Sequence, residues 1–500
     1  MTDATVAAER GATGARHVDV LIVGAGISGI GGAHHLREQR PDTSFVILES
    51  MDTFGGTWAT HTYPGIRSDS DLFTFGYRFK PWPGPPIATG GEILQYLGEV
   101  IEDSDLDRYI CYQHQVVSAA WSTDERQWSL DVVRTDTGEQ LRFTASFLWM
   151  CQGYYRHSEG YTPEWPGMDR FEGPVVHPQI WPEDLDYEGK RVVVIGSGAT
   201  AATLVPAIAD EVEHVTMLQR SPTFFYVRPN ANELADQLRA LDVPEEWTHE
   251  IVRRQILRDQ AEANNLALAF PEEARQLLIE EIRPHLPEGF DVEKHFNPPY
   301  RPWQQRIAVV PEGDLFAGIR SGKASVATDE IETFTETGID LKSGESLDAD
   351  IIITATGFEL SVLGDIDFTV DGQAFDFADS VTYRGLMFTG VPNLLYVFGY
   401  FRYSWTLRAD LISDFVCRLL GHMNELDASI VVPQLRDEDA DMGLLPWVDP
   451  ENFNPGYLTR SMHLMPKQGD RKPWQLLHDY MVEKEELPAA DLDDGALTYR

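Results

Sequence analysis

The chain has 500 residues, a length that exceeds one compact core and predicts two or three domains. Its 80 acidic and 40 basic residues give a formal net charge of −40, and a field of that sign argues against nucleic acids and anionic membranes as partners. The acidic surface leaves two interpretations open, an ordinary acidic protein or a halophilic one adapted to a cytoplasm of high salt concentration.

No apolar run approaches the roughly 20 residues that a membrane span requires, so no span is expected. Residues 1–16 lack the apolar core of a signal peptide and predict a disordered tail and a cytoplasmic location. The widely spaced Cys111, Cys151 and Cys417 form no CxxC redox centre and predict buried thiols. No metal site is expected, because the histidines lack partners at metal-ligand spacing.

The first fifty residues predict one βαβ unit. Residues 18–23 are a continuous apolar stretch, typical of a parallel strand that is buried on both faces. A glycine-rich turn and a helix follow, and residues 45–48 form the second strand, which ends at Glu49. Alternating stretches within residues 103–150 then predict an antiparallel meander that packs on this unit.

The same plan returns at residues 191–219, where a strand, a glycine turn, a helix and a second strand follow one another. Leucines at helical spacing and proline breaks over residues 230–285 predict a helical insertion. A buried strand ending at Gly357 comes next. Around residues 407–423, apolar residues at every fourth position predict a long helix with one face on the core.

These elements predict an α/β protein with two dinucleotide-binding, Rossmann-like domains, the second inserted within the first. The first domain is expected to comprise residues 17–155 and 345–500. The second is expected to comprise residues 156–344 and to carry the helical insertion at residues 230–300.

The first glycine turn has the dinucleotide fingerprint Gly24-Ala-Gly26-Ile-Ser-Gly29. It follows a strand and opens a helix, and Glu49 stands where an acid that binds a ribose hydroxyl belongs. The glycines permit a tight turn and let a pyrophosphate reach the free N–H groups of the helix N-terminus. With strand, helix and acid in place, a dinucleotide site is favoured over a merely glycine-rich turn.

The second glycine turn, Gly196-Ser-Gly198-Ala-Thr-Ala201, has alanine at its third position. Its second strand ends in Gln219-Arg220-Ser221 instead of an acid. Arginine can form a charge-assisted hydrogen bond with a 2′-phosphate, which predicts NADPH in preference to NADH. The alternative is that Arg220 is a solvated surface residue.

An acid-ended site beside an arginine-ended site predicts FAD and NADPH on one chain. Because no CxxC motif is present to relay electrons to a disulfide, the electrons are expected to leave the flavin by another route. Molecular oxygen is the usual acceptor, so the sequence indicates an oxygen-using flavoenzyme.

The twelve residues from Phe171 to Pro182 read FEGPVVHPQIWP and fit the pattern FxGxxxHxxxWP of Baeyer–Villiger monooxygenases, which are class B flavoprotein monooxygenases. The segments GGTW at 55–58 and YPGIRSDSD at 63–71 also resemble flavin-facing segments of this family. They are most similar to the branch that contains the mycobacterial ethionamide-activating monooxygenase. The resemblance runs from Val18 to Trp474.

The resemblance implies that a C4a-peroxyflavin oxidises small ketones to esters or lactones and sulfides to sulfoxides, using NADPH and O2. Arg306 matches the arginine that stabilises the peroxide anion and the tetrahedral adduct, and Asp69 matches the aspartate that orients this arginine. Taken alone, each residue is equally well explained as a structural ion-pair member. Gln305 replaces a lysine that is common in the family, which leaves Arg220 with more of the phosphate binding.

The fingerprints and the resemblance together predict three sets of site residues. The catalytic pair is Arg306 and Asp69. The flavin site is expected to include Gly24, Gly26, Ser28, Gly29, Glu49, Gly56, Thr57, Trp58, Arg67, Asp69 and Val116. The NADPH site is expected to include Gly196, Ser197, Gly198, Ala199, Thr200, Ala201, Arg220 and Ser221.

Three other functions stay open on the sequence. A flavin monooxygenase restricted to nitrogen and sulfur would attack with a protonated hydroperoxide. An NADPH-dependent flavin reductase would pass electrons to a partner, and a flavin-binding module would catalyse nothing.

Two residues of the twelve-residue signature, His177 and Trp181, are assigned either to packing or to coupling between the domains, and neither is expected to be catalytic.

Overall fold

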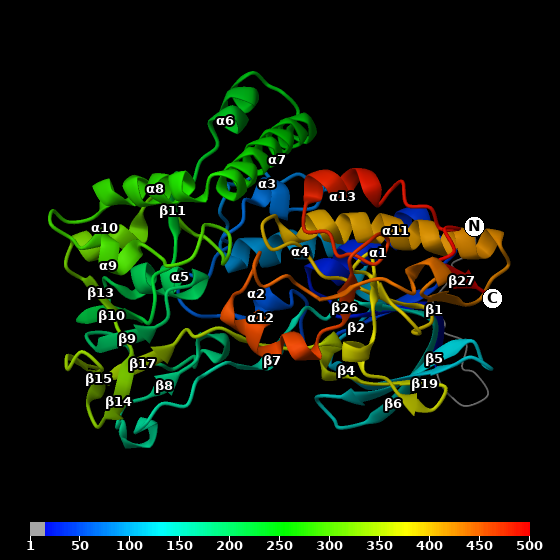
Figure 1. Ribbon diagram of the computed structural model, residues 1–500, viewed down its shortest axis with the longest axis horizontal. Coiled ribbons are helices and arrows are strands. Elements are labelled where there is room, and N and C mark those ends of the chain that lie inside the picture. Colours follow the sequence, from blue (N-terminus) through cyan, green and yellow to red (C-terminus); the bar gives the residue numbers. More distant parts are fainter. Residues whose placement is uncertain (1–15) are drawn as a thin grey trace.

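The computed structural model describes residues 16–500, so the predicted disordered tail lies outside the described residues except for Arg16. The chain forms two lobes, each built on one large sheet (Figure 1). The predicted first βαβ unit is confirmed, with parallel pairing of β1 and β2. Its elements are β1 (Arg16–Val23), α1 (Ile27–Gln39) and β2 (Phe45–Leu48).

The first sheet has nine strands, in the order β20-β19-β4-β5-β6-β1-β2-β3, with β23 also paired to β6. The predicted meander is confirmed, because β4, β5 and β6 are antiparallel neighbours. Strand β6 then runs parallel to β1. The added strands are β3 (Ile110–Cys111), β4 (His114–Ser122), β5 (Gln127–Arg134), β6 (Gln140–Met150), β19 (Asp367–Val370), β20 (Gln373–Ala374) and β23 (Leu394–Tyr396).

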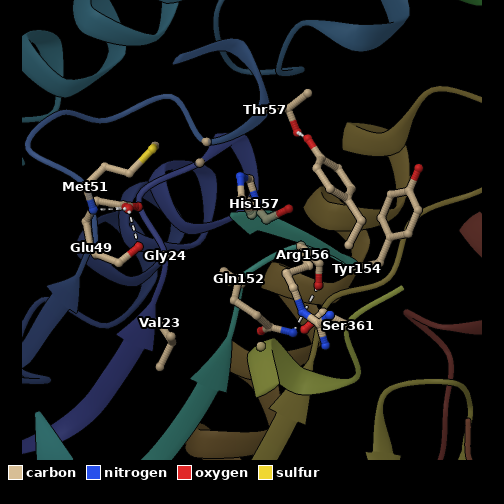
Figure 2. A pocket seen from close by; sticks show the side chains of 18 of the residues that line it. Val23, Gly24, Glu49, Met51, Thr57, Gln152, Tyr154, Arg156, His157 and Ser361 are labelled. Carbon is tan, nitrogen blue, oxygen red and sulfur yellow. Dashed lines mark hydrogen bonds between the residues drawn. The ribbon is translucent and has the colours of Figure 1, made fainter. Parts of the chain in front are cut away.

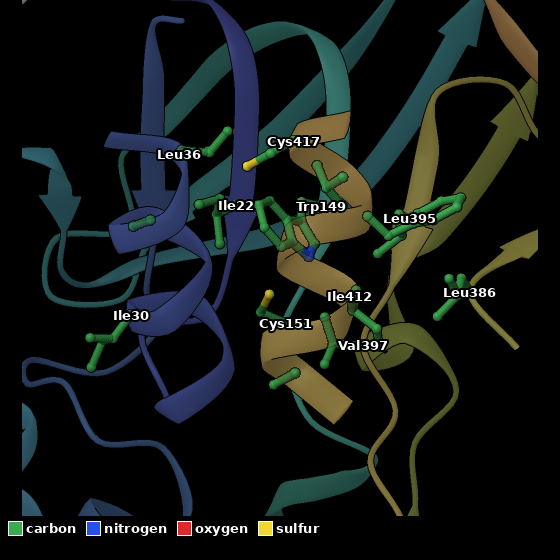
Figure 3. Packing of buried hydrophobic residues seen from close by; sticks show 14 of the residues in the cluster. Ile22, Ile30, Leu36, Trp149, Cys151, Leu386, Leu395, Val397, Ile412 and Cys417 are labelled. Atoms are coloured by element: carbon green, nitrogen blue, oxygen red, sulfur yellow. The ribbon is translucent and has the colours of Figure 1, made fainter. Parts of the chain in front are cut away.

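Helices α1 and α11 (Trp405–Glu425) pack side by side against this sheet and enclose its core (Figure 3). The predicted long helix at residues 407–423 is therefore confirmed. Ile22 of β1, Trp149 of β6 and Ile412 of α11 are fully buried in the same cluster. Cys151 and Cys417 are buried as predicted, whereas Cys111 is only partly buried, and all three are free thiols.

The second sheet is parallel, in the order β13-β10-β9-β17-β8. The predicted second βαβ unit is confirmed within it, because α5 (Ala199–Ile208) joins β9 to β10. Helix α10 (Asp314–Arg320) packs on α5. The strands are β8 (Val175–Val176), β9 (Arg191–Ile195), β10 (His214–Gln219), β13 (Ala324–Thr328) and β17 (Ile351–Thr354).

The strand that was expected before Gly357 is present as β17, but it pairs with the second sheet and not with the first. Ile352 lies opposite Val193 of β9 and Val175 of β8. The chain was predicted to return to the first domain at residue 345. Strand β17 lies after that boundary but belongs to the second sheet. The reason is that an apolar run predicts burial of a strand but does not specify its neighbours. The division into two domains otherwise stays a prediction.

The helical insertion is confirmed as α6 (Glu233–Ala240), α7 (Glu245–Ala269) and α8 (Pro271–Ile282). The first of these helices ends at Ala240, and Leu241 is its C-cap. Helices α6 and α7 stand out from the top of the molecule (Figure 1). Helix α7 contacts the first lobe through the short α3 (Leu72–Phe75).

Short elements connect and cover the lobes. Strands β7 (Tyr155–Gly160) and β18 (Phe358–Leu360) pair where the chain passes between the two sheets. The other elements that bear on the site are α2 (Thr57–Thr60), α4 (Gly90–Asp103), α9 (Val292–Phe296), α12 (Gly456–Ser461), α13 (Tyr480–Glu486), and the parallel pair β11 (Phe225–Arg228) and β12 (Ala308–Pro311).

Candidate active site

The first glycine turn is closed so tightly that side chains are excluded from it. Gly24 has φ +100°, and a Cβ there would lie 2.8 Å from the carbonyl oxygen of Cys151. A Cβ on Gly29 would lie 1.9 Å from the carbonyl oxygen of Gly24. The turn thus leaves the N-terminus of α1 open to a phosphate, which is the cradle that a dinucleotide requires.

Glu49 is buried at the end of β2, with 5% of its surface exposed. Its Oε2 accepts a hydrogen bond from the backbone N–H of Ala25 (2.7 Å), and its Oε1 accepts one from that of Met51 (2.9 Å). Burial raises the pKa of Glu49 above its usual value. The carboxylate borders the cavity in Figure 2, where it can accept a hydrogen bond from a ribose hydroxyl.

A cavity of about 490 Å³ extends from this turn into the first lobe. It is bordered by the ends of β1 and β2, residues 55–58 and 114–117, residues 151–158 beyond β6, and Trp405. Of the predicted flavin-site residues, Gly29, Arg67 and Asp69 are not among those that line it. The predicted residues that do line it are Gly24, Gly26, Ser28, Glu49, Gly56, Thr57, Trp58 and Val116.

Aromatic residues form a wall of the cavity that the sequence analysis missed. The hydroxyl of Tyr155 donates to Oγ1 of Thr57 (2.7 Å). Tyr154 stacks on Trp405 with ring centroids 5.3 Å apart, and the indole N–H of Trp405 donates to Oγ of Ser28 (2.8 Å). The available signal was the pair of tyrosines just beyond β6, at the carboxyl end of a strand parallel to β1.

The expected contact between Arg306 and Asp69 is present, and its catalytic role stays a prediction. Nη2 of Arg306 lies 2.9 Å and 3.1 Å from the two carboxylate oxygens of Asp69. Asp69 raises the pKa of Arg306 above its usual value, so the guanidinium stays charged at every physiological pH. Burial raises the pKa of Tyr154, and the positive charge of Arg306 opposes this rise. Tyr154, which lines the cavity, therefore lies within the electrostatic reach of Arg306.

The second glycine turn is closed at one side and open at the other. Gly196 has φ +128°, and a Cβ there would lie 2.2 Å from the carbonyl oxygen of Ala355. A Cβ on Gly198 would meet no atom within 4 Å. Residues Ala199, Thr200 and Ala201 form the first turn of α5, whose amide groups can meet a phosphate.

The end of β10 presents one buried and one exposed side chain. Gln219 is 2% exposed, and its Nε2 donates to Oγ1 of Thr328 (2.8 Å). Arg220 is exposed, which fits both the predicted phosphate contact and the alternative of a solvated surface residue. Oγ of Ser197 contacts Oγ1 of Thr223 (2.8 Å) and donates to the carbonyl oxygen of Ser221 (3.4 Å), which fixes the strand end beside the glycine turn.

Arg67 and two further residues of the sequence analysis, Gln305 and His177, lie outside the cavity. Arg67 forms an ion pair with Asp314 of α10. Nε2 of Gln305 donates a long hydrogen bond to Asn454 (3.4 Å). His177 contacts the carbonyl oxygen of Gly357 through Nε2 (3.1 Å), so it holds the chain where it passes between the two sheets.

Two absences concern the part of the chain that the structure describes. Within residues 16–500, no group of three or more histidine, cysteine, aspartate or glutamate side chains is arranged to hold a metal ion. No helix in the same range is long and apolar enough to cross a membrane.

Fold and site together define a flavoenzyme of the two-dinucleotide type, and comparisons with known proteins agree. The family model described as flavin-binding monooxygenase-like matches residues 81–236, and that of an NAD(P)-binding Rossmann-like domain matches residues 22–80. The structure resembles an oxidized steroid monooxygenase bound to NADP, with TM-score 0.75 and 23% identity over 97% of this chain and 99% of that one. A cyclohexanone monooxygenase from Rhodococcus sp. Phi1 gives TM-score 0.66 and 24% identity over 84% and 86%.

Curated relatives are closer in sequence. The FAD-containing monooxygenase EthA of Mycobacterium tuberculosis is 46% identical over 485 residues, which are 97% of this chain and 98% of the relative. The probable FAD-binding monooxygenase AlmA of Acinetobacter baylyi is 44% identical over 490 residues, 97% of this chain and 96% of the relative. The chain therefore belongs to the family of FAD-containing monooxygenases. The predicted fold class, the flavin monooxygenase activity and the cofactors FAD and NADPH are confirmed.

Proposed function

We propose that the protein oxidises a small ketone or sulfide. A ketone, O2, NADPH and a proton give an ester or lactone, NADP⁺ and water, and a sulfide gives the sulfoxide. The observation that carries the ketone reaction is the Arg306–Asp69 pair, a permanent cation whose charge acts on Tyr154 in the aromatic wall of the cavity. Attack on a carbonyl carbon places negative charge on its oxygen, and a fixed cation stabilises that charge.

The chain supplies binding groups for both cofactors. Gly24, Gly29 and Glu49 would hold FAD, whose bound flavin supplies the oxygen activation that no side chain provides. The α5 N-terminus and Arg220 would hold NADPH, the source of the two electrons. Asp69 keeps the guanidinium of Arg306 in one orientation, so the charge is in place before the substrate arrives.

A cytoplasmic location is part of this proposal. Cys111, Cys151 and Cys417 are all free thiols. A reducing compartment keeps cysteines in this state.

The test is product analysis with isotopically labelled oxygen. The purified enzyme with FAD and NADPH is incubated under ¹⁸O2 with a linear methyl ketone or, separately, with an aryl methyl sulfide. The proposal expects one labelled oxygen in the ester and one in the sulfoxide. Labelled sulfoxide without ester would favour a monooxygenase restricted to heteroatoms, and NADPH oxidation without labelled product would favour a reductase.

Variants of two arginines distinguish the loss of the charge of Arg306 from a general disturbance of the fold. Arg306→Ala should abolish ester formation while NADPH still bleaches the flavin under anaerobic conditions. Arg301→Ala is the matched control, because Arg301 lies in the same loop but donates to the carbonyl oxygen of Glu451 (2.9 Å). Equal loss of ester in both variants would contradict the role of Arg306.

A further inference from the structure

Three ion pairs at every second residue join one segment of the first lobe, residues 67–71, to the second lobe. The partners of this segment lie at the end of β11, in the loop before β12 and at the start of α10. The pairs are Arg67 with Asp314, Asp69 with Arg306, and Asp71 with Arg228.

With both side chains of each pair taken together, the outer two pairs are less exposed than the central one. The exposed fractions are 18% and 33% for Arg67 and Asp314, 24% and 5% for Arg228 and Asp71, and 41% and 26% for Arg306 and Asp69. Arg67 contacts both carboxylate oxygens of Asp314, and Nη2 of Arg228 lies 2.7 Å from the carboxylate of Asp71. Desolvated, hydrogen-bonded pairs of this kind keep a fixed geometry better than exposed ones.

The central pair depends on its neighbours because Arg306 lacks regular structure of its own. It lies in a loop that extends from the end of α9 to the start of β12. Among the described residues, its side chain hydrogen-bonds to Asp69, which stands two residues from both Arg67 and Asp71. A shift of about 1 Å in a catalytic group can cost roughly a hundredfold in rate.

We propose that the Arg67–Asp314 and Asp71–Arg228 pairs are positioning residues that hold the two lobes in the register at which Asp69 aims Arg306 at the cavity. This inference rests on the proposed role of Arg306. If an outer pair is weakened, the rate of oxygen transfer to the substrate should fall more than the rate of NADPH oxidation. The remaining turnover then converts NADPH, a proton and O2 into NADP⁺ and hydrogen peroxide, without an oxidised substrate.

The primary variant is Asp314→Asn, which removes one outer charge with little change of shape. Its matched control is Glu245→Gln, which removes a half-buried ion pair with Arg239 (2.6 Å) inside the helical insertion. We expect Asp314→Asn to lower the yield of oxidised substrate per NADPH by about tenfold, with a matching gain in hydrogen peroxide. Glu245→Gln should leave this yield unchanged.

Hydrogen exchange supplies a readout that does not depend on turnover. Peptides that cover residues 66–72 and 300–308 should exchange faster in Asp314→Asn than in the wild type, while peptides of the first sheet keep their protection. Asp71→Asn should act in the same direction. Asp71→Asn leaves the buried Arg228 without its carboxylate and can therefore fail to fold. In that case Asp314→Asn and Arg67→Lys decide the question. Arg67→Lys keeps the positive charge and should lose less of the yield of oxidised substrate than Asp314→Asn.

The outcomes separate this inference from the proposed function. If the wild type forms neither ester nor sulfoxide, the proposed function is wrong, and hydrogen exchange alone decides whether the outer pairs order the loop of Arg306. If the wild type forms product and Asp314→Asn matches it in yield and in exchange, the outer pairs are not positioning residues. A uniform loss of protection across the whole chain would equally overturn the inference, because it indicates general destabilisation.

Discussion

The two glycine turns occupy equivalent places in their βαβ units, yet they differ in how closely the helix approaches the strand. In the first, a Cβ at Gly29 would lie 1.9 Å from a backbone oxygen. In the second, Ala201 stands at the same position of the fingerprint and is fully buried without such a collision. The third residue of the fingerprint therefore reports the spacing between helix and strand, and it does not report which cofactor binds.

The ends of the second strands differ in charge and in exposure. Glu49 is buried and fixed by two backbone N–H groups. Its counterpart is the buried Gln219, followed by the exposed Arg220. A buried carboxylate can serve a ribose hydroxyl inside a cavity, whereas an exposed guanidinium can meet a doubly charged phosphate at the surface. This contrast agrees with the prediction that FAD binds the first unit and NADPH the second.

The largest effect is expected at the tighter turn. Gly29→Ala should lower the free energy of unfolding by about 3 kcal/mol or more, because its Cβ meets backbone that cannot move aside. Gly198→Ala is the control in the second unit, and it should change stability by less than about 0.5 kcal/mol, because its Cβ meets open space. Urea unfolding and FAD retention on gel filtration measure both. Similar losses in the two variants would refute the difference in spacing.

The next effect concerns the buried acid. Glu49→Gln keeps one oxygen acceptor but turns an amide NH2 toward the backbone N–H of Ala25 or Met51. An unpaired donor in a buried site should cost about 2 kcal/mol, seen as weaker FAD binding in a fluorescence titration. NADPH binding to the second unit should not change. Unaltered FAD affinity would show that the carboxylate is not part of the first site.

The insertion follows the second unit in sequence but docks on the first lobe through a histidine. Nδ1 of His249 accepts a hydrogen bond from the backbone N–H of Trp82 (3.2 Å). Burial lowers the pKa of His249 from 6.5 to about 4. Stability is then fully present above pH 6.5 and is lost as the pH falls toward 4, because the unfolded chain binds the proton first. About 2 kcal/mol should be lost between about pH 7 and pH 5.

The same experiment on His249→Gln isolates this contribution. The variant should show a flatter dependence of its unfolding free energy on pH, as measured by urea titration at several pH values. Other buried histidines also titrate, so the comparison is the difference between variant and wild type. Identical slopes would mean that protonation of His249 does not cause the loss of stability at low pH.

The smallest effect is expected at the exposed arginine. Arg220→Ala should raise the KM for NADPH about tenfold, which corresponds to about 1.4 kcal/mol, because one charge-assisted contact with the 2′-phosphate is lost. The KM for NADH, which has no such phosphate, should change by less than about twofold. Steady-state kinetics with both nucleotides decide the matter, and equal increases would count against the phosphate role.

The local features could be predicted from the sequence because they depend on neighbouring residues. Both glycine turns, their flanking strands, the meander and the helical insertion follow from hydrophobic periodicity and from glycine and proline positions. The prediction for β17 shows the limit of this reasoning. Its apolar run fixed a buried strand, but its place between β9 and β8 depends on parts of the chain more than 150 residues away.

The sequence by itself determined the two dinucleotide units, the contrast between Glu49 and Arg220, and, through family resemblance, the pairing of Arg306 with Asp69. Only the tertiary structure decided that Arg67 pairs with Asp314 and that Tyr154 stacks on Trp405. The physical reason is that a βαβ turn is closed by contacts within about 30 residues. The ion pairs of residues 67–71 and the aromatic wall form only when distant segments pack together. The local sequence pattern does not predict which distant segments come into contact.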